Sequence, residues 1–141
     1  RRRASARRRA VKSLIVAPDN TVFLMRSHKW NGDYVMPGGH LELGETMEIA
    51  LRREIREETG LEIRDIAFLG HQEFIYDEAY WKPRHFIFFD FACRSDSKDA
   101  TLSDEGQSYV WVTPEEALAL AVEPYTRRAI YRYLGMAPLS P

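Results

Sequence analysis

The sequence predicts an α/β domain in which a mixed β-sheet is layered between helices. Two apolar runs, 11–17 and 84–93, are rich in β-branched or aromatic residues and are typical of buried strands. Between them, residues 45–60 form a predicted helix of about four turns that ends at Gly60, a residue suited to closing a helix. Strands and helices mix along one unit without repeats, which favours a sheet covered by helices.

The composition is that of a single globular domain. Of the 141 residues, 45% are hydrophobic and 29% are charged, both ordinary values. No apolar run approaches the ~20 residues of a membrane span, and no secretory signal pattern opens the chain. Cys93 is the only cysteine, which excludes an internal disulfide and favours a reducing, cytoplasmic location. The expected assembly is a monomer or a homodimer without membrane contact.

The net charge of −1 conceals a basic segment. Six of the 20 Lys and Arg residues are arginines within residues 1–9, which leaves 14 basic against 21 acidic residues, or −7, elsewhere. We interpret residues 1–9 as a basic, flexible N-terminal tail and residues 10–141 as the folded domain. A contact with nucleic acid is the alternative. It is disfavoured because no aromatic residues are interleaved in the segment.

The other elements follow from turn and capping signals. Pro18-Asp19-Asn20 is a turn signal that predicts a β-hairpin between 11–17 and the strand after it. Thr113–Glu116 is a capping box with proline at the first helical position, so a helix begins there. The remaining expected elements are strands at 21–26, 62–71, 73–75 and 109–112, loops at 27–34 and 76–83, and a last helix at 124–134 closed by Gly135.

Three glutamates crowd the end of the central predicted helix. Glu54, Glu57 and Glu58 are spaced i, i+3 and i+4, so their side chains converge. On a helical wheel, Glu54 and Glu58 share the face of the core residues, and Glu57 lies at its border. Two carboxylates ~6 Å apart repel by roughly 3 kcal/mol at an effective dielectric constant of ~20, a cost that a divalent cation removes. Ligation by oxygen alone predicts Mg²⁺, with Mn²⁺ as a substitute.

The stretch 39–61 resembles the Nudix box, written G-x5-E-x7-R-E-U-x-E-E-x-G-U with U a bulky aliphatic residue. Every specified position matches, namely Gly39, Glu45, Arg53, Glu54, Ile55, Glu57, Glu58, Gly60 and Leu61. By this motif the chain is identified as a member of the Nudix hydrolase family. The resemblance implies a Nudix-fold α/β/α sandwich with a mixed sheet.

The resemblance also implies a chemistry, the Mg²⁺-dependent hydrolysis of a diphosphate linkage in a nucleoside derivative. Glu57 and Glu58 are expected to bind the metal, and Glu54 is either a further ligand or the general base. Arg53, paired with Glu45, is expected to orient the cluster. The Gly39 carbonyl is expected to complete the coordination.

A second resemblance lies outside the box. Asp104-Glu105-Gly106-Gln107, followed by Trp111, is similar to the EGQ segment of MutT, the enzyme that removes oxidised dGTP. It implies that Glu105 reaches the metal cluster from a separate loop, as a ligand and catalytic residue. The alternative is an ordinary acidic turn.

Substrate contacts are expected from aromatic and basic residues in the flanking loops. Aromatic rings there can stack on a nucleobase, or can simply cover the core. The candidates are Arg26, Trp30, Tyr34, Tyr80 and Trp81. The EGQ segment favours a MutT-like nucleoside triphosphate pyrophosphohydrolase. An ADP-ribose or dinucleoside polyphosphate hydrolase and a nucleotide-binding regulator without catalysis remain as alternatives.

Overall fold

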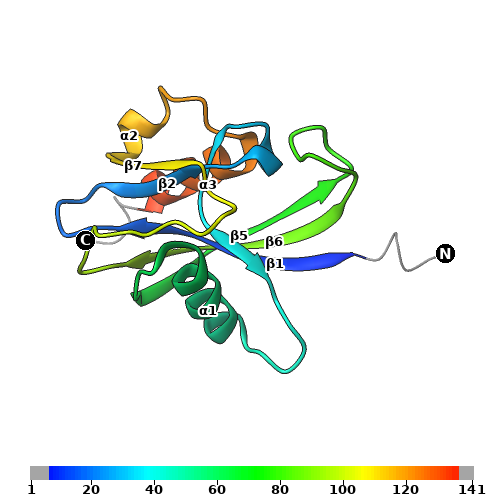
Figure 1. Ribbon diagram of the computed structural model, residues 1–141, viewed down its shortest axis with the longest axis horizontal. Coiled ribbons are helices and arrows are strands. Elements are labelled where there is room, and N and C mark those ends of the chain that lie inside the picture. The colour runs from blue at the N-terminus through cyan, green and yellow to red at the C-terminus, as the bar shows by residue number, and fades with distance from the viewer. Residues whose placement is uncertain (1–6, 137–141) are drawn as a thin grey trace.

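A computed structural model describes residues 7–136 and contains a seven-stranded mixed sheet with helices on both faces (Figure 1). The main path through the sheet is β3-β2-β1-β6-β5, while β4 pairs with β1 and β7 pairs with β2. The strands are β1 (Arg8–Val16), β2 (Val22–Arg26), β3 (Tyr34–Val35), β4 (Gly38–His40), β5 (Arg64–Ile75), β6 (His85–Arg94) and β7 (Ser108–Val112). The α/β class predicted from the sequence is confirmed.

Strand β1 is the central element of this sheet. It runs parallel to β6 along its whole length and antiparallel to β2 at one end and β4 at the other. Lys12 is consequently flanked by Asp90 of β6 on one side and Gly38 of β4 on the other. This register brings the glycine turn before the central helix against the middle of the sheet.

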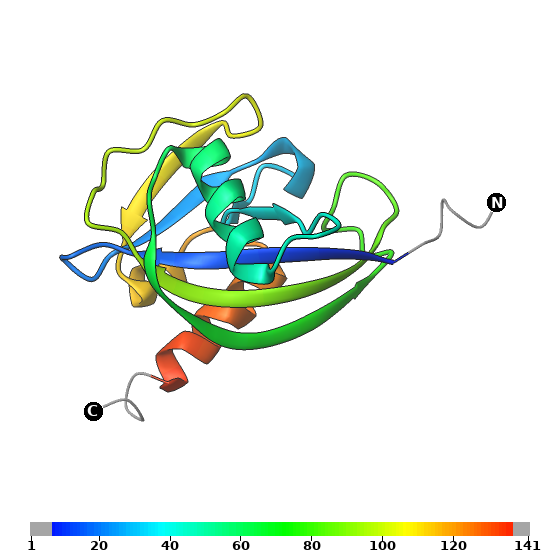
Figure 2. The ribbon, with the colours of Figure 1, turned by 90° about the horizontal axis from the view of Figure 1, so that it is seen from below.

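Helices α1 (Met47–Thr59) and α3 (Pro124–Met136) cover opposite faces of the sheet, with α1 in front of the strands and α3 behind them in Figure 2. Thr46 caps the start of α1 by accepting a hydrogen bond from the Ile49 amide at 3.2 Å. Gly60 closes the helix with a left-handed φ of 73°. The helix buries Ala50, Leu51 and Ile55 against the sheet, which sets the direction of the glutamates on the same face.

The order of the predicted elements agrees with the structure, but the short strands β3 and β4 were not predicted, and several boundaries differ. A short 3₁₀ helix, His28–Trp30, interrupts the predicted loop 27–34. Strand β5 is continuous through Gln72, because this polar residue is buried and its amide bonds to a partner inside the sheet. Helix α3 continues through Gly135 to Met136, so Gly135 does not close it. Helix α2 is short, Pro114–Ala117, and carries the predicted capping box.

The predicted tail boundary at residue 9 is also moved by the structure. Arg8 and Arg9 already pair with Phe86 and Ile87 as the first residues of β1. Residues 1–6 of the predicted tail lie outside the described residues. Within residues 7–136, none of the helices has the length and apolar character needed to cross a membrane.

Candidate active site

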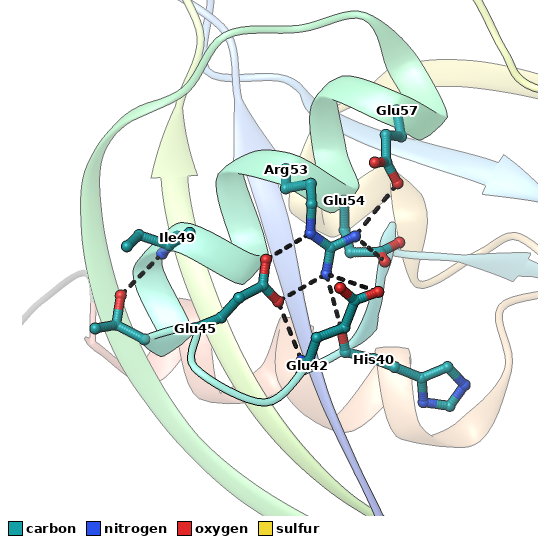
Figure 3. A network of polar contacts seen from close by, with 8 residues as sticks. His40, Glu42, Glu45, Ile49, Arg53, Glu54 and Glu57 are labelled. Carbon is teal, nitrogen blue, oxygen red and sulfur yellow. Dashed lines mark hydrogen bonds and ion pairs between the residues drawn. The ribbon is translucent and has the colours of Figure 1, made fainter.

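Arg53 is the centre of a network that joins α1 to the loop before it (Figure 3). Its Nε and Nη2 atoms donate to the two Glu45 carboxylate oxygens at 2.6 and 2.9 Å. Nη1 donates to Glu54 at 2.8 Å and to Glu57 at 3.3 Å, and Nη2 also donates to the His40 carbonyl at 3.1 Å. A planar guanidinium suits this multidentate role because its donors are fixed in one fork. The predicted pairing of Arg53 with Glu45 is therefore present.

The charges in this network reinforce one another. Hydrogen bonding to Arg53 lowers the pKa of Glu45, so that carboxylate stays ionised. In return, the hydrogen bond to Glu45 is the main cause that raises the pKa of Arg53. The Glu42 amide also donates to Glu45 at 3.1 Å, which ties the loop to the start of the helix. The orientation of Glu54 thus depends on a loop several residues before the helix.

Glu54 and Glu58 face inward from the same helix. Burial raises the pKa of Glu58 to about 8, and the neighbouring Glu54 and Glu105 carboxylates act in the same direction. One Glu58 oxygen accepts a hydrogen bond from the Gly38 amide at 2.8 Å. Burial also raises the pKa of Glu54, although Arg53 opposes this effect. Glu58 has no ion-pair partner among residues 7–136, and Glu54 shares the single guanidinium of Arg53 with Glu45 and Glu57.

Gly38 and Gly39 are required here for two different close approaches. A Cβ atom at Gly39 would lie 2.1 Å from Oε1 of Glu54, so the glycine leaves room for that carboxylate. A Cβ atom at Gly38 would lie 2.1 Å from the Val11 carbonyl oxygen and 2.6 Å from the Lys12 Cα atom, both in the backbone of β1. A side chain at position 39 would therefore displace a movable carboxylate, whereas a side chain at position 38 would clash with the backbone of the sheet.

We expect Gly39→Ala to lower kcat roughly tenfold or more while the fold is kept, because the Glu54 carboxylate must leave its position. Gly38→Ala should instead lower the free energy of unfolding by about 1–3 kcal/mol, because the added methyl group would clash with the backbone of β1. Steady-state kinetics and urea unfolding of both variants check this. Similar losses of stability in the two variants would contradict the distinction.

The inward-facing glutamates border a cavity of about 180 Å³ between α1, the glycine turn and the sheet. Its polar lining includes Glu54, Glu58, Glu105, Lys29 and Lys12. Its aromatic lining is Trp30, Tyr80, Phe86 and Phe88. One hollow therefore joins a group of carboxylates to a group of aromatic rings.

Of the five residues predicted to contact substrate, two line the cavity and three do not. Trp30 and Tyr80 line the cavity and pack edge-to-face, with ring centroids 4.8 Å apart. Arg26, Tyr34 and Trp81 are not among the lining residues. Arg26 donates to the Gly32 carbonyl at 2.8 Å and lies over the Tyr34 ring, and Trp81 packs against His28. These three residues brace the loops around the cavity.

Two of the predicted metal ligands are paired with cations at the surface. Glu105 lines the cavity and receives a hydrogen bond from the Lys29 ammonium at 2.9 Å. Glu57, whose side chain is 60% exposed, is held by Arg53 and does not line the cavity. Glu57 and Glu58, although adjacent in sequence, therefore point to different surroundings.

The donor set fits a hard divalent cation. In the part of the chain that the structure describes, no three acidic, histidine or cysteine side chains already converge as a ready-made metal site. Glu54 and Glu58 nevertheless line one cavity, burial raises the pKa of both, and Glu58 has no ion-pair partner among residues 7–136. Carboxylate and carbonyl oxygens are the ligands that Mg²⁺ and Mn²⁺ prefer. A cation there would supply the missing charge.

Lys12 is a residue of the cavity that the sequence analysis did not select. It belongs to the apolar run 11–17, and the residue is only 6% exposed in β1. A lysine within such a run is itself a signal, because buried lysines need a specific reason. Burial lowers the pKa of Lys12, while Glu123, Asp90 and Glu58 oppose this effect in that order.

Asp90 lies beside Lys12 in the sheet and is fully buried. Its Oδ2 atom accepts a hydrogen bond from Gln72 at 2.7 Å, while Oδ1 has no hydrogen-bond partner among residues 7–136. Burial raises the pKa of Asp90 from 3.8 to about 6. Because the folded state holds this proton more tightly, the stability that Asp90 contributes is present below pH ~4 and is lost as the pH rises through 6.

Asp90→Asn should therefore become more stable relative to the unchanged protein as the pH rises. Between pH 4 and 7, we expect the difference in unfolding free energy to grow by up to about 3 kcal/mol in favour of the variant. Chemical unfolding across this pH range measures it. The matched control is Asp96→Asn, since ion pairing with Arg64 lowers the pKa of exposed Asp96 and no such gain is expected. A difference for Asp90→Asn that is flat with pH would contradict the assignment.

Comparison with known proteins agrees with the geometry. A family model described as NUDIX domain matches residues 6–134, so the chain belongs to the Nudix family and is a Nudix hydrolase. The family predicted from residues 39–61 is thereby confirmed.

Among particular relatives, the nucleoside triphosphatase NudI of Enterobacter sp. (strain 638) is 38% identical over 102 residues, which cover 68% of this chain and 72% of the relative. NudI of Salmonella paratyphi B (strain ATCC BAA-1250 / SPB7) is 37% identical over 105 residues, or 70% of this chain and 74% of the relative. The MutT protein of Methanosarcina mazei Go1 superposes with a TM-score of 0.76 at 23% identity, covering 95% of this chain and 96% of that one. The E. coli ORF135 protein has a TM-score of 0.77 at 20% identity, covering 97% and 95%. These two structures show that the fold is shared.

Proposed function

We propose that this Nudix hydrolase is an Mg²⁺-dependent pyrophosphohydrolase of nucleoside triphosphates, with a MutT-like housecleaning role. The observation that carries the proposal is the cavity that joins Glu54, Glu58 and Glu105 to the rings of Trp30 and Tyr80. A nucleotide has the same two parts, an anionic phosphate chain that needs cations and a base that stacks on aromatic rings. The names of the NudI relatives support the same substrate class.

The ion would be held by Glu58 and Glu54 inside the cavity, together with the carbonyl of Gly39. Glu57 and Glu105 would complete the set by exchanging their present partners, Arg53 and Lys29, for the metal. When bound, Mg²⁺ neutralises phosphate charge and polarises the phosphorus–oxygen bond. Its binding would also relieve the repulsion among these carboxylates.

The protein side chains then position water and substrate. Arg53 fixes the Glu54 carboxylate, which would accept a proton from the attacking water. The water oxygen would bond to the α- or β-phosphorus as the bond from that phosphorus to the oxygen bridging them breaks, and the departing pyrophosphate or nucleoside monophosphate would keep the electron pair. The cytoplasmic location and the monomeric or homodimeric state stay predictions.

Glu105→Gln should lower kcat roughly tenfold or more at saturating Mg²⁺, as is typical for residues that tune a metal site. The free energy of unfolding should change little, because the Glu105 side chain is 54% exposed. Asp104→Asn, one residue earlier in the same exposed loop, is the matched control and should keep its activity. An unchanged kcat for Glu105→Gln would remove Glu105 from the site.

The experiment that tests the proposed function is a substrate panel with Mg²⁺. The panel contains the ribo- and deoxynucleoside triphosphates, ADP-ribose and diadenosine polyphosphates, with products resolved by ion-exchange chromatography. We expect nucleoside triphosphates to give a nucleoside monophosphate and pyrophosphate. A preference for ADP-ribose or a dinucleoside polyphosphate would replace the proposed substrate class. Nucleotide binding without turnover of any compound would instead identify a binding module.

A further inference from the structure

The proposed reaction does not use the ammonium group of Lys12. Lys12 lines the cavity, yet Nζ has no hydrogen-bond partner among residues 7–136. It lies 4.4 Å from the centroid of the Trp30 ring and 4.9 Å from that of Phe88. These rings attract a cation through their faces but accept no ordinary hydrogen bond. Three N–H donors are thus directed into a sheltered space without an acceptor.

The ammonium belongs to the aromatic end of the cavity. Trp30 and Phe88 are its nearest rings, and Trp30 also packs against Tyr80. Its electrostatic partners are chiefly Glu123 and Asp90, while Glu58 of the carboxylate group contributes less. The parallel pairing of β1 with β6 fixes Lys12 beside Asp90. This position corresponds to the base of a nucleotide whose phosphates lie at Glu54 and Glu58.

We propose that Lys12 is a specificity-determining residue that selects nucleotides with a keto oxygen on the base, as in guanine, thymine and uracil. This inference rests on the proposed function and narrows its substrate class. An ammonium group only donates hydrogen bonds. Guanine O6 and thymine O4 are acceptors, whereas adenine and cytosine carry an amino group at the corresponding position. An amino group at that position would set donor against donor.

A purely structural role explains the residue poorly. Placing a lysine side chain in the interior of the sheet has a desolvation cost, and an apolar side chain of the same length would pack between Trp30 and Phe88 without that cost. A general phosphate contact is a different reading, in which Lys12 would serve every nucleotide alike. The two readings differ in whether the effect of removing the ammonium depends on the base.

The first test compares Lys12→Met with the unchanged protein on dGTP, dTTP, dATP and dCTP. We expect the unchanged protein to prefer dGTP and dTTP. Lys12→Met should lower kcat/KM for those two by about tenfold or more, and should change the values for dATP and dCTP less than about threefold. Lys82→Met, which removes an exposed lysine 4.6 Å from the Trp81 ring, is the matched control and should leave all four values unchanged. An equal loss on all four substrates, or an original preference for dATP and dCTP, would overturn the proposal.

The second test needs no turnover and so separates this inference from the proposed function. Calorimetric titration with dGMP, dTMP, dAMP and dCMP measures base recognition directly. We expect tighter binding of dGMP and dTMP, and loss of that difference in Lys12→Met. If triphosphate hydrolysis is absent but the binding difference is found, the proposed function fails and the assignment of Lys12 stands. Equal affinities in the unchanged protein would overturn the assignment of Lys12 alone.

The melting temperature of Lys12→Met should not fall, and a large fall would indicate a structural role for Lys12 instead.

Discussion

Glu58→Gln is expected to lower kcat by about 10²-fold or more, because charge neutralisation by a bound metal is worth several kcal/mol in phosphoryl transfer. The substituted side-chain amide still offers an oxygen to the Gly38 N–H group, so the turn before α1 keeps its contact. The substitution removes a carboxylate whose burial raises its pKa to about 8. The metal-free variant should therefore be at least as stable as the unchanged protein. Initial rates at saturating Mg²⁺ and thermal unfolding with a chelator measure the two effects.

Glu48→Gln is the control for this substitution. Glu48 lies on the same helix, has an exposed side chain, and pairs with Arg52 at 3.2 Å on the outer face. Its loss should change neither kcat nor stability measurably. If Glu58→Gln kept full activity, or lost activity only in proportion to a loss of folded protein, Glu58 would not be a metal ligand.

Arg53→Lys is expected to have the second largest effect, a fall in kcat of about 10²-fold with only a moderate loss of stability. A lysine ammonium cannot bond both Glu45 oxygens and Glu54 in the fork that the guanidinium provides. A displacement of Glu54 by about 1 Å is enough for a loss of this size. The broken charged hydrogen bonds should lower the unfolding free energy by about 1–3 kcal/mol.

The chain provides a closely matched control in Arg56→Lys. Arg56 makes the same two-pronged contact, to Glu62 at 2.7 and 3.0 Å, but on the exposed face of α1. Both kcat and stability should be nearly unchanged in this variant. Equal kinetic losses in the two arginine variants would mean that Arg53 acts only through helix stability.

The ends of α1 and the ion pairs along it were predictable, because interactions between residues close in sequence determine them. Thr46 and Gly60 bound α1 through capping and a left-handed φ, and Glu48 pairs with Arg52 as i,i+4 spacing predicts. The contact of Arg53 with Glu45 was also predicted, since both belong to one motif. The boundaries of β1 and β5 were less predictable. Their ends depend on pairing with β6, a strand that is distant in sequence.

The lining of the cavity was only partly predictable for the same reason. Trp30 and Tyr80 were selected as aromatics in loops, but Tyr34 and Trp81 met the same criterion and do not line the cavity. Which loop aromatic faces inward depends on how the loops pack on β6. Lys12 was not selected because an apolar run suggests a core strand, and only the folded structure shows that its ammonium lies over the Trp30 ring.

Direct binding of a divalent ion tests the central claim, that Glu54 and Glu58 form the metal-binding side of the cavity. Mn²⁺ is titrated calorimetrically into the unchanged protein, Glu58→Gln and Glu48→Gln without nucleotide. We predict that Glu58→Gln weakens Mn²⁺ binding by about tenfold or more, while Glu48→Gln binds like the unchanged protein. Equal Mn²⁺ affinity in all three proteins would place the ion elsewhere and contradict the claim.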